Sequence, residues 1–177
     1  MLAEGRVSRC ILAHGFVVLT MASSHVRSTD AALLERLREG RSRSTTFRTL
    51  VDELDRLGTI VYVERGICGF GHYKACLPHS MTIAGGTRFL RIVVERGQGT
   101  AQELALIGHE LQHALEIARA PDIRSSDDIT ALFRRIGRSP HCPRGTPDCY
   151  ETSAALAAGD AVLREVLASF NAPRRQR

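Results

Sequence analysis

Residues 100–120 limit the possible folds of this chain more than any other segment, because they are predicted to form one long helix with an apolar stripe. The apolar side chains recur at steps of three and four residues, as they do along one face of an α-helix; they are Leu104, Ile107, Leu111, Leu115 and Ala118. Thr100 and Glu103 fit a capping box at the start, and Pro121 marks the end. Such a stripe has to be buried, so we expect the other elements to pack around this helix.

The middle of the predicted helix carries the run His-Glu-Leu-Gln-His, from His109 to His113. Residues four apart lie one above the other on a helix, so the two imidazoles can bind the same metal ion. Glu110 lies one position round the helix, where its carboxylate can hold an attacking water molecule. This is the H-E-x-x-H arrangement of zinc hydrolases. The alternative interpretation is a surface helix with two solvated histidines.

The segment from residue 100 to residue 120 resembles the active-site helix of the zincin metallopeptidases. The resemblance implies a zincin-like α+β fold in which a small sheet packs on the helix. It also implies one zinc ion per chain, a peptide or protein substrate, and Glu110 as the general base of a hydrolase. In zincins the strand before this helix often forms the rim of the cleft. That strand would be residues 87–94, and a free edge on it could pair with an extended peptide.

The flanking sequence predicts the rest of an α+β fold with helices at both ends. Gly40 and Gly58 are expected to end the first two helices, and Gly85-Gly86 is a two-residue hairpin signal. Three β-branched or alternating segments predict a small, mostly antiparallel, three-stranded sheet ahead of the metal helix. The expected helices are residues 28–40, 45–57, 126–136 and 150–169, and the expected strands are residues 59–64, 80–84 and 87–94.

A catalytic zinc site needs a third protein ligand and one open position. Glu116 lies about 10 Å along the helix axis from His109, so we expect it beside the ligands or in solvent instead of among them. Arg119 occupies the position at which metzincins carry their third ligand, which excludes that pattern.

Two downstream residues compete for the third ligand position. Glu151 begins a predicted helix rich in small residues, which resembles the glutamate helix of gluzincins. In this chain Ala155 replaces the acid that usually follows that glutamate four residues later. The alternatives are His141 as the ligand and Glu151 as a charge at a helix N-terminus, with Asp148 as its cap.

A peptidase site also needs a donor for the oxyanion that develops during hydrolysis. The residues that could serve are Tyr150, His141, His72 and His79, and the sequence does not rank them.

Two other functions compete with a peptidase. One is a peptide deformylase, in which Cys68 would be an upstream metal ligand, but the sequence around Cys68 lacks that family's motifs. The other is a zincin-like domain that binds a metal or a partner without turnover, which the departure at Ala155 keeps open.

Composition indicates one domain and argues against several partner classes. The chain has 177 residues, 44% hydrophobic residues, no Trp and a net charge of +5 with Lys74 as its only lysine. The arginines are interleaved with acids, so no nucleic-acid footprint is visible. No apolar run reaches the length of a membrane span. We expect a monomer without stable membrane insertion.

Residues 1–24 resemble a signal peptide, with Arg6 and Arg9 ahead of an apolar run and small residues after it. The mature domain would then be residues 25–172, followed by a disordered basic tail at 173–177. This predicts a secreted or periplasmic protein, or a cytoplasmic one if Met21 is the true start.

Besides Cys10, the cysteines fall into two local pairs in Gly- and Pro-rich loops. In an oxidising compartment this predicts the disulfides Cys68–Cys76 and Cys142–Cys149. The alternative is four reduced thiols.

We predict that the exported protein starts near His25 and carries both disulfides. Peptide mapping by mass spectrometry of the exported protein, without reduction, tests this directly. Free thiols, or an intact Met1 on exported protein, would contradict it.

Overall fold

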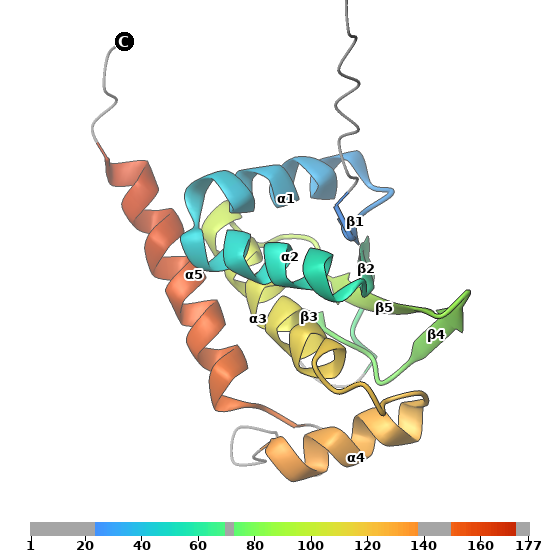
Figure 1. Cartoon of the computed structure of the whole chain (residues 1–177). Coiled ribbons are helices and arrows are strands. Elements are labelled where there is room, and N and C mark those ends of the chain that lie inside the picture. Colours follow the sequence, from blue (N-terminus) through green and yellow to red (C-terminus); the bar gives the residue numbers. More distant parts are fainter. Residues whose placement is uncertain (1–23, 70–72, 138–149, 173–177) are drawn as a thin grey trace, which may run out of the picture.

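The described chain forms one mixed sheet with helices before and after its main strands (Figure 1). The computed structural model describes residues 24–69, 73–137 and 150–172. In chain order its elements are β1 (Val26–Arg27), α1 (Ala31–Arg43), α2 (Thr45–Leu57), β2 (Ile60–Arg65), β3 (Ala75–Cys76), β4 (Met81–Ala84), β5 (Thr87–Val94), α3 (Thr100–Ala118), α4 (Ser126–Ile136) and α5 (Ser153–Asn171). The predicted α+β class is confirmed.

The sheet differs from the predicted one in strand number and in direction. It has five strands in the order β1-β2-β5-β3, and β4 also pairs with β5. The β1–β2 and β2–β5 pairs are parallel, whereas β3 and β4 run antiparallel to β5. The expectation of three mostly antiparallel strands is therefore wrong. Two of the strands have only two residues each, too few to show an alternating pattern in the sequence.

The hairpin between β4 and β5 is confirmed. Gly85 and Gly86 have φ angles of 56° and 79°, as a two-residue turn with left-handed backbone requires. Ala84 pairs with Thr87 directly across the turn.

β5 has partners on both sides, so it cannot be the rim strand with a free edge that the sequence predicted. β2 pairs along one side of β5, and β4 and β3 follow each other along the other side. Within the described sheet, β3 and β4 are therefore the edge strands on that side.

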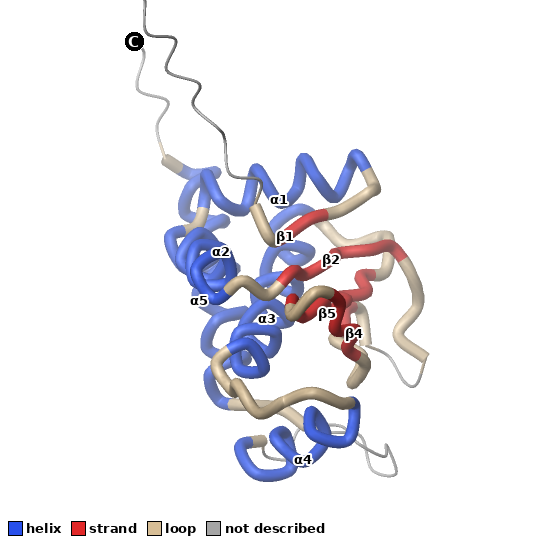
Figure 2. The backbone as a smooth tube through the Cα atoms, turned by 45° about the vertical axis from the view of Figure 1, so that its right-hand side comes forward, coloured by secondary structure: helices blue, strands red, loops and turns tan. Residues whose placement is uncertain are grey.

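The helix α3 lies at the centre of the fold, between α5 and α2 on one side and the sheet on the other (Figures 1 and 2). Its apolar stripe is buried as predicted, and Leu104, Ile107 and Leu111 have no exposed surface. His113 and two glutamates of α3 are also buried, which is unusual for residues of these types.

The start of α3 is fixed by an ion cluster instead of the predicted capping box. Its N-cap is Gly99, which makes no side-chain cap. Glu103 is 3% exposed, and its Oε2 accepts a hydrogen bond of 2.9 Å from Arg36 Nε. Its other oxygen pairs with Arg65, and Arg36 also donates to the Thr100 hydroxyl. Arg36 of α1 and Arg65 of β2 thus bind the Thr100 hydroxyl and the Glu103 carboxylate, which would otherwise have formed the capping box.

The predicted helix ends are right at Gly58 and Gly137 and wrong at Gly40. α2 spans the predicted residues, and Gly58 ends it with a φ of 71°. α1 instead continues past Gly40 to Arg43, because Gly40 serves close packing: a Cβ there would lie 2.9 Å from Leu104 Cδ2. α4 also matches its prediction, whereas α5 begins at Ser153.

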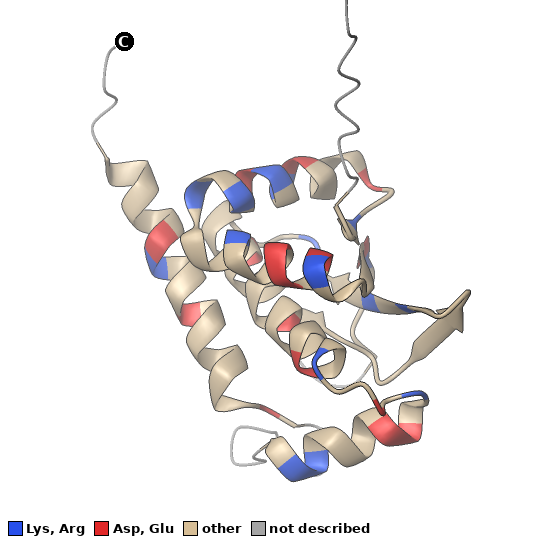
Figure 3. Ribbon diagram, viewed as in Figure 1, with Lys and Arg blue, Asp and Glu red and all other residues tan. Residues whose placement is uncertain are grey.

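Acidic and basic residues are mixed along α1 and α2 (Figure 3). Several form ion pairs, such as Arg43 with Glu39 and Arg41 with Asp52. Among the described residues, no helix is both long and apolar enough to cross a membrane.

Candidate metal centre

Close contact between α3 and α5 fixes the position of His109. Gly108 and Gly159 face each other's helix without side chains in the way. A Cβ on Gly108 would lie 2.8 Å from Val162 Cγ2, and one on Gly159 would lie 3.3 Å from His109 Cβ. The small residues of α5 therefore let the imidazole of His109 lie against its backbone.

Glu151 completes a group of three residues that could hold a metal ion. Its Oε2 lies 3.0 Å from His109 Nε2 and 3.8 Å from His113 Nε2. One donor atom from each residue lies within 4.8 Å of the other two. The structure thus brings together the three residues predicted as ligands, although Glu151 precedes α5 and does not begin it, because Thr152 is the N-cap.

The donor set fits a bound cation. Glu151 Oε2 is buried and has no hydrogen-bond partner among the described residues, even though two imidazoles lie close to it. A buried carboxylate oxygen without a hydrogen bond is costly unless another group compensates it. A metal ion held by Nε2 of both histidines and by this oxygen would supply the compensation. The ion's identity does not follow from this geometry.

The charges of the group depend on each other. Burial raises the pKa of Glu151, but the two neighbouring imidazoles outweigh it and bring the pKa to about 2. Burial lowers the pKa of His113, but the carboxylates of Glu116 and Glu151 outweigh it and raise the pKa to about 10. Without a metal, the site is therefore held by attraction between an imidazolium and carboxylates.

Glu116 lies beside the ligands, as one of the predicted alternatives has it. Its Oε2 lies 3.0 Å from Nδ1 of His113, the ring nitrogen that does not face Glu151. Its Oε1 accepts a hydrogen bond of 2.7 Å from the Thr152 hydroxyl.

Glu110 is 6% exposed and lies next to both histidines. Burial raises the pKa of its carboxyl above the ordinary value, while both histidines and the backbone N–H of Leu77 act in the opposite direction. Leu77 follows β3, so the edge of the sheet reaches the carboxylate predicted to be the general base.

Two of the predicted oxyanion donors, His79 and Tyr150, belong to an aromatic cluster that reaches His113 through Phe133. The His79 ring stacks on the rings of Phe133 and Tyr150, with ring centroids 5.3 Å and 6.2 Å apart. The rings of Phe133 and His113 are nearly perpendicular, with centroids 5.1 Å apart. Sequence reasoning missed Phe133, whose spacing in α4 marks it only as a core residue. The other two predicted donors, His72 and His141, lie outside the described residues, and so does the alternative assignment of His141 as third ligand.

The disulfide Cys68–Cys76 is present, as predicted. With Cys68 bonded to Cys76, the Cys68 sulfur is not the free thiolate that the deformylase alternative would need as a metal ligand. The second predicted pair, Cys142–Cys149, lies outside the described residues.

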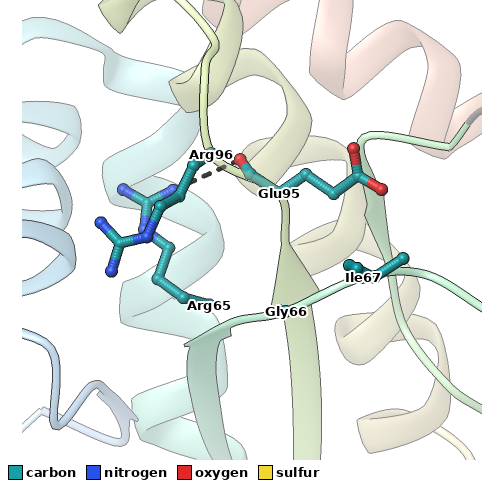
Figure 4. A pocket seen from close by; sticks show the side chains of 5 residues that line it. All are labelled: Arg65, Gly66, Ile67, Glu95 and Arg96. Carbon is teal, nitrogen blue, oxygen red and sulfur yellow. Dashed lines mark hydrogen bonds between the residues drawn. The ribbon is translucent and has the colours of Figure 1, made fainter.

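An open pocket of about 460 Å³ lies elsewhere, at the carboxyl ends of β2 and β5. Figure 4 shows the guanidinium groups of Arg65 and Arg96 on one side and the Glu95 carboxylate on the other. None of the three ligand residues lines this pocket.

No protein-family model matches the chain, and no curated protein or solved structure is significantly similar to it. The function must therefore be argued from the site itself.

We predict that the metal-free protein loses folding stability as the pH rises from about 6.5 to about 10. The pKa of His113 is raised by folding, so its contribution is complete below the unfolded value and is lost as the pH rises through the folded one. Urea unfolding of EDTA-treated protein at several pH values measures this. His113→Gln should make the pH dependence shallower, and an unchanged pH dependence in that variant would contradict the assignment.

Proposed function

We propose that this protein is a secreted, zinc-dependent peptidase of the gluzincin-like zincin type, with His109, His113 and Glu151 as metal ligands. The observation that carries the proposal is the convergence of two imidazole nitrogens and one carboxylate oxygen within 4.8 Å. Two histidines and a glutamate form the ligand set of several catalytic zinc sites, which keep a fourth position open.

Glu110 is the general base in this proposal. When bound, zinc would polarise the peptide carbonyl and lower the pKa of a water molecule toward neutrality. The Glu110 carboxylate would take a proton from the attacking water and later pass it to the leaving amine. Its raised pKa favours the first transfer, because a buried carboxylate binds a proton more strongly than an exposed one.

The edge of the sheet offers a binding mode for an extended peptide. β4 is largely exposed, and Leu77 between β3 and β4 contacts Glu110. An extended substrate could add to this edge through backbone hydrogen bonds and present its scissile bond to Glu110. Of the residues predicted as oxyanion donors, the described ones are His79 and Tyr150, whose rings stack on each other.

The disulfide supports the secreted location in this proposal. Cys68 and Cys76 are bonded, and disulfides persist mainly in oxidising compartments.

The second candidate function is a metal-binding domain without turnover. Ala155 is fully buried at the position where gluzincins carry an acid, so that supporting carboxylate is absent from the described site. Glu116 instead supports a histidine from within α3.

We predict that Glu110→Gln leaves zinc binding almost unchanged and lowers peptide hydrolysis by roughly 10²–10⁴-fold, the loss expected when a general base is removed. The substitution keeps the size of the side chain and leaves all three ligands in place. Zinc content by elemental analysis and cleavage of a broad peptide library give the two readouts.

His113→Ala is the matched control, because it removes a ligand and should lose both zinc and cleavage. Cleavage by Glu110→Gln at the parental rate would show that the mechanism is wrong. If the parent binds zinc and cleaves nothing in the library, the non-enzymatic function is favoured.

A further inference from the structure

Glu116 is a largely buried carboxylate that belongs to neither the proposed ligands nor the proposed base. Its side chain is 10% exposed, on the last turns of α3. Both of its oxygens are engaged: one by His113 Nδ1 at 3.0 Å and the other by the Thr152 hydroxyl at 2.7 Å. Gln112 approaches the second oxygen at 3.5 Å.

The directions of these hydrogen bonds determine which nitrogen of a neutral His113 ring carries the proton. Thr152 Oγ1 accepts from the backbone N–H of Ala155 and gives its only proton to Glu116. An ionised carboxylate only accepts, so the Nδ1 of His113 must be the donor to Glu116. The lone pair of a neutral His113 then lies on Nε2, the nitrogen that faces Glu151.

Thr152 links the two segments that supply the ligands. It is 4% exposed, caps α5 and follows Glu151 directly in the chain. A continuous path of hydrogen bonds therefore runs from the ring of His113 through Glu116 to Thr152, which is covalently joined to Glu151. The Glu151 carboxylate in turn lies 3.8 Å from Nε2 of His113. The path joins α3 to a residue 36 positions away from Glu116 in sequence.

We infer that Glu116 and Thr152 are positioning residues that together hold the His113 ring and the Glu151 carboxylate at the relative positions that metal binding needs. This inference rests on the metal site of the proposed function. It adds the hydrogen bonds that keep α3 aligned with the segment that carries Glu151. Groups that hydrogen-bond to metal-ligating histidines fix the ring's tautomer and orientation, and their loss commonly weakens metal binding.

A purely local role for the same residues makes different predictions. Glu116 with His113 could be only a stabilising pair within one helix, and Thr152 only a cap. Substitutions of Glu116 and Thr152 would then change folding stability without changing the geometry of a bound ion. The affinity for Zn²⁺ and the absorption spectrum of bound Co²⁺ therefore distinguish the two roles.

The test measures Zn²⁺ affinity of the full chain by competition with a chromophoric chelator, and the visible absorption of the Co²⁺-loaded protein. Glu116→Gln and Thr152→Val should each weaken zinc by about 10–100-fold and change the Co²⁺ spectrum. The double variant should be little weaker than Glu116→Gln alone, because both changes break one path.

Two controls account for stability. Thr152→Ser keeps the hydroxyl and should bind zinc like the parent. Ser125→Ala removes the N-cap of α4, eight residues before Phe133, and should lower the melting temperature without altering zinc affinity. If Glu116→Gln does not fold, the inference is decided by whether Thr152→Val binds zinc more weakly than Thr152→Ser does.

Parental zinc affinity and Co²⁺ spectra in Glu116→Gln and Thr152→Val would overturn the inference and leave the proposed metal site standing. A parent chain that binds no zinc would overturn the proposed function, and this inference with it.

Discussion

The contact between α3 and α5 is the interaction on which the candidate site depends. α3 supplies both histidines, and α5 fixes the position of the segment that carries Glu151. The two helices approach closely because glycines stand where larger side chains would collide, at Gly108 against Val162 and at Gly159 against His109. A protein interior tolerates little added volume at such contacts. The position of His109 is therefore a consequence of helix packing, and Glu151 lies directly before the N-cap of the helix that packs there.

The central helix buries the carboxylates of Glu103 and Glu110 and covers most of a third, Glu116, and each is compensated in a different way. Glu103 pairs with two arginines, which ties α3 to α1 and β2. Glu110 has a raised pKa and a backbone donor from Leu77. Glu116 is held by His113 and Thr152. The first arrangement fixes the helix in the fold, and the other two lie beside the group that could hold a metal ion. Buried charges of this kind are costly, so their concentration on one helix supports a functional role for that helix.

Local patterns in the sequence predicted the elements whose signals are local. The apolar stripe of α3 and the glycines after α2 and between β4 and β5 gave the right helices and hairpin, because each signal acts within a few residues. The pairing direction of β2 with β5 was not predictable, since it depends on segments about thirty residues apart. The same holds for the buried partners of Glu103, which displaced a capping box that the sequence alone favoured.

The three residues that the sequence predicted as ligands lie together in the structure, because histidine spacing on a helix is local and a third acid had few competitors. Sequence reasoning did not foresee that Thr152 would bind Glu116 or that Leu77 would reach Glu110. These contacts join α3 to segments 36 and 33 positions away, and their residue types have no distinctive spacing.

The central claim is that zinc is bound by His109, His113 and Glu151, and X-ray absorption at the zinc edge tests it most directly. For protein loaded with one equivalent of zinc, we predict two imidazole ligands and an oxygen shell, with metal–ligand distances of about 2.0–2.2 Å. Sulfur at about 2.3 Å, or fewer than two imidazoles around the ion, would contradict the account.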